Sequence, residues 1–264
     1  MIDLKGKKLL ICEEALIDYK GHFYSWIKAI RQINKQHGAQ VFVAGSKDIS
    51  LPIKEEFNVI PAYTHNNWSG IYDYPQSWKR YLAVLKHNSR IYRQTKNVLR
   101  KIGKVDCIIL PASRIYHLIA WLFLCRFGLG KSFDRVVIFI LTSEAVYDKN
   151  FTSFRFKKSS LLMQTVLKAL GKYVRTGRVV LAGDSHITCK EYESMSGIPF
   201  KVFPSPAAGL QASTESDPTI HIKRNSHPTF VILGVSVIDK GIDLLQDAIL
   251  QILEKNPTIN AKFI

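Results

Sequence analysis

Short apolar runs that alternate with longer amphipathic stretches constrain the fold of this chain more than any other feature of its sequence. The runs KLLIC at 8–12, CIIL at 107–110 and VVIFIL at 136–141 are almost wholly apolar. Strands of this kind are covered on both faces, and their regular alternation with helices produces a parallel sheet with right-handed crossovers. The sequence therefore predicts an α/β fold with a Rossmann-like parallel sheet.

The predicted helices place apolar residues three or four positions apart. One helix is predicted within 21–37 and another within 161–173. The longest is marked by six apolar side chains at helical spacing: Trp78, Leu82, Leu85, Tyr92, Leu99 and Ile102. The very apolar stretch 117–127 is about half as long as the roughly 20 residues that a membrane span needs. It is predicted to be a buried helix instead.

A proline-rich segment, 204–228, divides the chain. It contains few hydrophobic residues and four prolines: Pro204, Pro206, Pro218 and Pro228. Such a composition is typical of an interdomain linker. Residues 1–206 are therefore predicted to form a first Rossmann-like domain, and residues 207–228 a linker.

The strand and helix order begins again after the linker, with TFVIL at 229–233. Residues 229–264 are predicted to hold the first strand and helix of a second Rossmann-like domain. A segment of this length with one helix cannot build a core of its own. The second domain is therefore expected to be truncated in this chain.

The net charge of +16 predicts an acidic partner. Residues 76–104 hold nine lysines and arginines and no acidic residue, and residues 149–178 hold eight and again none. On the second predicted helix, Lys168, Lys172 and Arg175 align at i, i+4 and i+7. This basic face is expected to lie on an anionic membrane surface. Nucleic acid is the rival partner, but the sequence has no RNP-like motif, zinc-finger spacing or arginine-glycine tract.

The four cysteines are far apart and have no histidine at metal-ligand spacing, so free thiols and no metal site are expected. The N-terminal residues do not form a signal peptide. The expected location is the cytoplasm, with peripheral contact at the cytoplasmic face of the membrane.

Two segments resemble a known family. GVSVIDKGIDLL at 234–245 resembles the G-R-x-x-x-x-K-G-x-x-x-L pattern that opens the donor domain of retaining GT-B glycosyltransferases of family 4, also called group 1 transferases. Residues 179–204 resemble the last strand, helix and strand of that family's acceptor domain. The order of elements agrees over the whole chain.

The resemblance implies transfer of a sugar from a nucleotide-sugar donor to a glycan or lipid-linked acceptor, as in polysaccharide biosynthesis, without a metal or cofactor. Lys240 would hold the donor diphosphate, and Gly21 would lie in the loop before a helix N-terminus that faces the phosphates. Val235 stands where the family has an arginine, which removes one phosphate ligand. Alternatively, Lys240 is a solvated lysine before a helix and Gly21 an ordinary tight turn.

The same resemblance names candidates for the cleft between donor and acceptor: His22, Ser143, Glu144, Asp184 and Ser185. Ser143 and Glu144 follow a predicted strand where the family often carries a histidine, and ligands of open parallel sheets bind at such strand ends. Helix capping or a surface position is the structural alternative for His22 and Glu144.

Other functions have to be weighed beside an active transferase. The family's two donor-domain glutamates would fall after Ile264, so the chain as given is expected to be inactive. Alternatively, the protein is a non-catalytic remnant that binds an acceptor, an anionic membrane or nucleic acid. A nicotinamide-dependent enzyme is disfavoured because Glu13 and Glu14 follow the first strand in place of G-x-G-x-x-G.

Overall fold

The computed structural model describes residues 4–19, 22–66, 77–148, 153–156, 160–203, 229–230, 242–256 and 262–263. The chain divides into two compact units, Met1–Gln211 and Ala212–Ile264. The predicted linker, 207–228, lies outside the described residues, and the predicted domain boundaries stay predictions.

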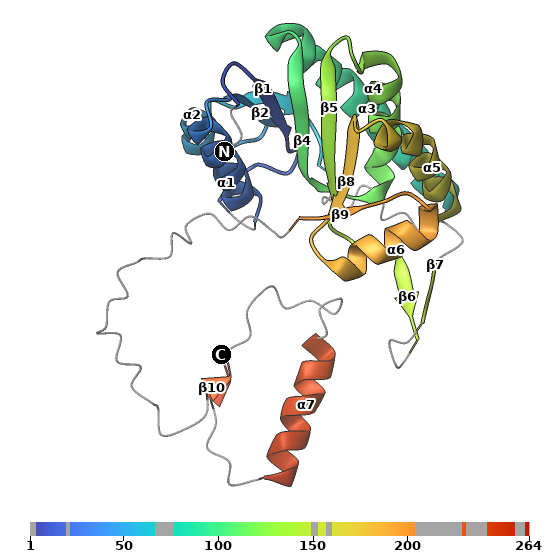
Figure 1. Ribbon diagram of the computed structural model, residues 1–264. Coiled ribbons are helices and arrows are strands. Elements are labelled where there is room, and N and C mark those ends of the chain that lie inside the picture. Colours follow the sequence, from blue (N-terminus) through green and yellow to red (C-terminus); the bar gives the residue numbers. More distant parts are fainter. Residues whose placement is uncertain are drawn as a thin grey trace. The chain divides into compact units, whose positions relative to one another are not determined.

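A seven-stranded, all-parallel sheet organises the first unit (Figure 1). Its strand order is β3-β2-β1-β4-β5-β8-β9. The strands are β1 (Lys8–Cys12), β2 (Gln40–Ser46), β3 (Ile60–Tyr63), β4 (Val105–Ser113), β5 (Phe133–Ile140), β8 (Val179–Gly183) and β9 (Lys201–Val202). The chain runs outward in one direction from β1 to β3 and in the other from β4 to β9. The order therefore reverses between β1 and β4.

Helices connect the strands. They are α1 (Phe23–Gln36), α2 (Leu51–Phe57), α3 (Ser77–Ile102), α4 (Leu118–Gly128), α5 (Leu161–Arg175) and α6 (His186–Ser196), with a 3₁₀ turn, η1 (Ile115–His117), before α4. A short antiparallel hairpin, β6 (Ala145–Tyr147) and β7 (Phe154–Phe156), follows β5. Because helices precede and follow parallel strands, each crossover helix runs antiparallel to its strands. The N-terminal half of α3 thus lies toward the carboxyl edge of the sheet.

Two apolar cores hold these layers together. Along β1, Leu10 and Cys12 face a core shared with α3, α4, α5 and α6, whereas Ile11 faces a smaller core under α1 and α2. This alternation follows from the pleat of a strand, which sends successive side chains to opposite faces. The helices therefore cover both faces of β1, as the unbroken apolar run predicts.

The predicted α/β class and parallel Rossmann-like sheet are confirmed. The helix α2 and the β6–β7 hairpin were not predicted. The predicted buried helix is α4, but only one side of it is buried, because Phe123 and Phe127 are exposed.

The second unit contains one described β-α-β segment: β10 (Thr229–Phe230), α7 (Ile242–Lys255) and β11 (Lys262–Phe263). The two strands pair in parallel, Thr229 with Lys262 and Phe230 with Phe263. This is the order of elements predicted for the start of a second Rossmann-like domain.

Candidate functional site

The reversal of strand order between β1 and β4 places a ligand-binding position at their carboxyl ends. In open α/β sheets the loops that leave two such strands separate to opposite faces, and this leaves room for a ligand. Glu13 and Glu14 follow β1, while Arg114 and η1 follow β4. The first functional groups at this edge are thus two carboxyl groups, a guanidinium and the imidazole of His117.

Three side chains from different elements meet at this edge: Glu14 after β1, His87 in α3 and His117 in η1. The Nε2 atom of His87 lies 3.1 Å from Oε2 of Glu14, and Nδ1 of His117 lies 3.5 Å from Oε1 of the same carboxylate. The side chains of His87, His117 and Glu14 are only 1%, 3% and 10% exposed. We call these residues the Glu14–His87–His117 cluster.

Burial shifts the pKa values of two titratable groups, Glu13 and His117, in and beside the cluster. It raises the pKa of Glu13 well above its usual range, although the N–H of Ala15 donates to that carboxyl group, and the charge of Glu14 raises this pKa further. Burial also lowers the pKa of His117 well below its usual range, and the positive charges of His87 and Arg114 act in the same direction. At neutral pH His117 is therefore a neutral imidazole, and its contact with Glu14 is not an ion pair.

Asn88 fixes α3 against η1 and α4. Its Nδ2 donates to the carbonyl oxygens of Val84 and Tyr116, each at 2.8 Å, and its Oδ1 accepts the N–H of Ala120 at 2.8 Å. The first N–H groups of a helix have no partner within the helix, so Asn88 caps α4 from a neighbouring helix. Since Asn88 follows His87, and Tyr116 precedes His117, these bonds hold the backbone at the two histidines in a fixed relation.

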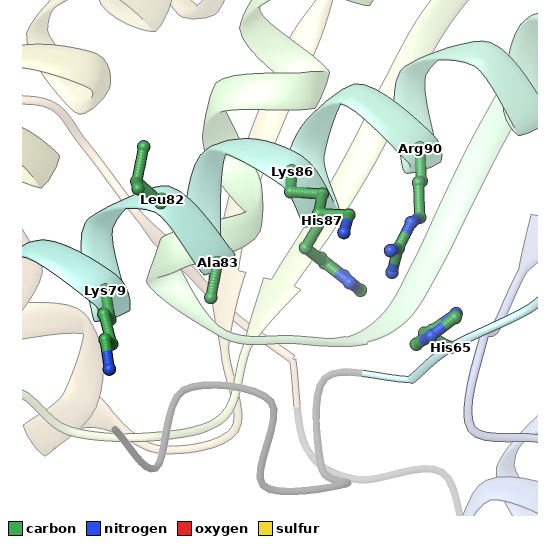
Figure 2. Close-up of a pocket in the computed structure, with 7 residues that line it drawn as sticks. All are labelled: His65, Lys79, Leu82, Ala83, Lys86, His87 and Arg90. Atoms are coloured by element: carbon green, nitrogen blue, oxygen red, sulfur yellow. The ribbon is translucent and has the colours of Figure 1, made fainter. Parts of the chain in front are cut away.

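A basic groove opens beside the cluster. It has a volume of about 570 Å³ and is lined by His65, Lys79, Leu82, Ala83, Lys86, His87 and Arg90. Figure 2 shows His87 and Arg90 pointing from α3 toward the loop that carries His65. Partial burial lowers the pKa of His65, and the positive charges of Arg90, His87 and Lys86 lower it further. The groove therefore has a positive potential that suits an anionic group such as a phosphate.

The N-terminal half of α3 also exposes an apolar face. Trp78, Tyr81, Leu82 and Leu85 are 59%, 47%, 56% and 53% exposed and recur at helical spacing. Lys79, Arg80 and Lys86 come from the same turns of the helix. Leu82 belongs to this face and also lines the basic groove. Apolar side chains flanked by cations are typical of helices that lie in a membrane interface.

Ser143 and Glu144, two of the predicted cleft residues, lie at the carboxyl end of β5. The hydroxyl of Ser143 donates to Glu191 of α6, as does the hydroxyl of Tyr147, each at 2.5 Å. The hydrogen bond to Glu191 raises the pKa of Tyr147 to about 12, with help from desolvation. Ser143 thus contacts a buried carboxyl group of the fold.

Glu144 is connected to the Glu14–His87–His117 cluster through Tyr116. Its Oε2 is 3.5 Å from the hydroxyl of Tyr116, the residue before His117. The carboxyl ends of β4 and β5 therefore share polar contacts at the edge where ligands are expected.

The remaining predicted cleft residues have local contacts. His22 is the N-cap residue of α1, and its ring lies 4.4 Å from the rings of both Phe23 and Trp26, centroid to centroid. Ser185 caps α6 by accepting the N–H of Thr188 at 3.2 Å. Asp184 lies next to it and accepts the Thr188 hydroxyl at 3.5 Å. Capping explains Ser185 without a ligand, and its predicted place in the cleft stays a prediction.

The predicted donor-phosphate residues Lys240 and Gly21 lie outside the described residues, so their roles stay predictions. The predicted membrane-facing residues Lys168, Lys172 and Arg175 are exposed on α5, as a basic surface requires. None of the helices in the described ranges is both long and apolar enough to cross a membrane.

Sequence reasoning did not find the Glu14–His87–His117 cluster, because its members are far apart in the chain. A signal existed for His87. It lies at helical spacing from Val84 and Ile91, both of which are buried, so a polar side chain occupies the core-facing side of α3. Buried polar residues in such positions need partners and therefore point to a polar network.

The sequence matches no protein-family model and no curated protein. Among solved structures, the glycosyltransferase SnogD from Streptomyces nogalater is 12% identical with a TM-score of 0.48, over 98% of this chain and 65% of that one. MurG from Acinetobacter baumannii is 10% identical with a TM-score of 0.41, over 98% and 67%.

The N-terminal domain of trehalose-6-phosphate phosphatase from Candida albicans is 12% identical with a TM-score of 0.43, over 74% of this chain and 44% of that one. The chain thus spans less than two thirds of the length of two of these three structures. Similarities this distant do not indicate an activity for this chain. Its function must be inferred from its own residues.

Proposed function

We propose that the chain belongs to a GT-B glycosyltransferase, related to family 4, that transfers a sugar from a nucleotide-sugar donor to an anionic, lipid-linked acceptor at the cytoplasmic membrane surface. One observation carries the proposal: a basic groove at the carboxyl edge of the first unit adjoins an exposed apolar helix face. A lipid-linked sugar phosphate has this combination of chemistry, an anionic head and an apolar tail. The first unit would then bind the acceptor.

The residues after β1 argue against a dinucleotide cofactor at the same edge. A dinucleotide pyrophosphate needs a glycine-rich turn and the N–H groups of a helix N-terminus directly after the first strand. Here Glu13 is 1% exposed and occupies that turn, and Glu14 follows it. Two adjacent carboxyl groups are unfavourable neighbours for a pyrophosphate.

The donor would be bound by the second unit. The resemblance at 234–245 supports this assignment through Lys240, whose positive charge would stabilise the nucleoside diphosphate as the bond to the sugar breaks. Val235, in place of the family's arginine, implies fewer charged contacts to the donor phosphates. No cofactor or resident metal enters this part of the proposal.

Transfer by the protein at its full natural length tests the proposal. The protein is incubated with a panel of nucleotide sugars and a polyprenyl phosphate or pyrophosphate acceptor in anionic vesicles, and release of nucleoside diphosphate and the mass of the lipid product are measured. The double variant K86A/R90A should raise the KM for the lipid acceptor by at least about tenfold, since hydrogen bonds to charged groups contribute about 1.5–3 kcal/mol each. Its matched control, K35A/K54A, removes two exposed lysines from α1 and α2, which are not among the predicted membrane-facing residues.

Two results would contradict the proposal. One is that no donor in the panel releases nucleoside diphosphate in the presence of lipid acceptor. The other is that the control variant K35A/K54A raises the KM as much as the groove variant, which would separate acceptor binding from the groove.

A further inference from the structure

The Glu14–His87–His117 cluster combines the donor atoms of a transition-metal site. Two imidazole nitrogens and a carboxylate form the ligand set of many zinc and iron(II) sites, and three protein ligands leave a position open for water or a ligand oxygen. Within the described part of the chain, this is the one group of three His, Cys, Asp or Glu residues whose ligand atoms all lie within 4.8 Å of one another.

The distances suit a tetrahedral ion. Bonds of about 2.0–2.2 Å to zinc place neighbouring ligand atoms about 3.3 Å apart. Nε2 of His87 lies 3.1 Å from Oε2 of Glu14, and Nδ1 of His117 lies 3.5 Å from Oε1, on either side of that value. One ligand atom from each of the three residues lies within 4.8 Å of the other two, so the three side chains would have to draw closer together around an ion.

The surroundings hold the ligands in place. Asn88 bonds to the carbonyl oxygen of Tyr116 and to the N–H of Ala120, so the positions of His87 and His117 are fixed by buried hydrogen bonds. A metal site needs its ligands held close to their bound geometry by such supporting contacts. The three ligands also come from three separate parts of the fold, the loop after β1, α3 and η1, and these elements are packed into one core.

The cluster borders two cavities. Glu14 and His117 line a small cavity of about 20 Å³ with Cys12, Tyr63 and Ser113, and His87 lines the basic groove. Because His87 lines the groove, an ion would reach the cluster from the groove side.

We propose that Glu14, His87 and His117 bind one zinc ion, or another divalent transition metal of similar size, at the carboxyl ends of β1 and β4. The two nitrogen donors favour such a metal over magnesium or calcium, which prefer oxygen ligands. The ion would replace the direct contact between Glu14 and His87. This inference does not depend on sugar transfer and departs from the expectation, drawn from the family resemblance, that no metal is used.

The test uses the whole chain without a polyhistidine tag, stripped with a chelator and dialysed. Zinc content is measured by elemental analysis after equilibrium dialysis against zinc, and the visible absorption of the cobalt(II) form reports on the ligands. One equivalent of zinc and a cobalt spectrum typical of tetrahedral nitrogen and oxygen coordination are expected. Each of the variants E14Q, H87Q and H117Q should weaken zinc binding by at least about tenfold, the lower end of the loss caused even by outer-shell substitutions.

The variant H65Q is the matched control, because His65 lines the same groove and is not a ligand in this proposal. It should retain one equivalent of zinc. If a ligand variant fails to fold, the wild-type chain still decides the matter, since zinc should raise its melting temperature reversibly and a chelator should lower it again. Absence of zinc binding by the wild-type chain, or equal binding by H65Q and the three ligand variants, would overturn the proposal whether or not the protein transfers sugar.

Discussion

At the scale of a single residue, the pKa of His65 reflects the positive potential of the basic groove. Its pKa lies below the usual value of 6.5, first because of desolvation and then because Arg90, His87 and Lys86 repel a proton. An anion bound in the groove would offset those charges and raise the pKa of His65. Because binding then favours the protonated imidazole, anion affinity should increase as the pH falls below about 7.

This prediction is checked with inorganic pyrophosphate as the probe. The pKa of His65 is measured by NMR titration with and without pyrophosphate, and an upward shift is expected. The variant H65Q should bind pyrophosphate with a weaker dependence on pH between 7 and 5.5 than the wild type. An unchanged His65 pKa at saturating pyrophosphate would show that the anion binds elsewhere.

At the scale of elements, the junction of α3, η1 and α4 depends on Asn88. This side chain is 3% exposed and makes three hydrogen bonds, one of which caps the N-terminus of α4. The substitution N88A would leave the N–H of Ala120 and the carbonyl of Tyr116 without this partner in a buried place. Its expected cost is about 1–3 kcal/mol of unfolding free energy, measured by urea denaturation.

The control for this prediction is N97A, which makes the same substitution at an exposed position of α3. Alanine has the higher helix propensity, so N97A should be neutral or slightly stabilising. Equal stabilities of the two variants would mean that the hydrogen bonds of Asn88 do not contribute to the fold.

The comparison of sequence with structure is also clearest at this scale. The strands β1, β4, β5 and β8 could be predicted because a strand covered on both faces of a parallel sheet is a short, almost wholly apolar run. The helix α2 was missed because seven residues, with Pro52 in the first turn, are too few to show helical periodicity. The long helix α3 was predicted, but the spacing of Trp78 and Leu85 could not reveal that both side chains are exposed.

The candidate site could be predicted only in part, for a related reason. The carboxyl end of β5 was found through Ser143 and Glu144, since strand ends can be located in a sequence. The Glu14–His87–His117 cluster depends on which face of α3 packs on the sheet and on where η1 ends. Those are properties of tertiary packing, and no local pattern fixes them.

At the scale of the whole molecule, charge and apolar surface together predict membrane binding. The net charge of +16 attracts anionic lipid over a Debye length, and each basic residue near the surface adds about 1 kcal/mol. The double variant W78S/L85S removes two exposed apolar side chains from α3. Because burial of each contributes about 1.5–3 kcal/mol, binding to anionic vesicles should weaken by more than tenfold in a flotation assay.

The control variant, I33S/L51S, removes two equally exposed apolar side chains from α1 and α2, on the opposite face of the sheet. It should bind vesicles like the wild type. Equal losses in the two variants, or no loss in W78S/L85S, would show that α3 is not the membrane-binding surface.

Leu82 lies on the exposed apolar face of α3 and also lines the basic groove. The position of this residue bears on how an acceptor would reach the groove. If that face lies in the bilayer, as we propose, the rim of the groove would lie at the level of the lipid headgroups. A lipid-linked acceptor would then arrive by lateral diffusion and would not have to leave the leaflet. Encounter would depend on the number of acceptor molecules per area of membrane, and dilution of the bulk solution would leave it unchanged.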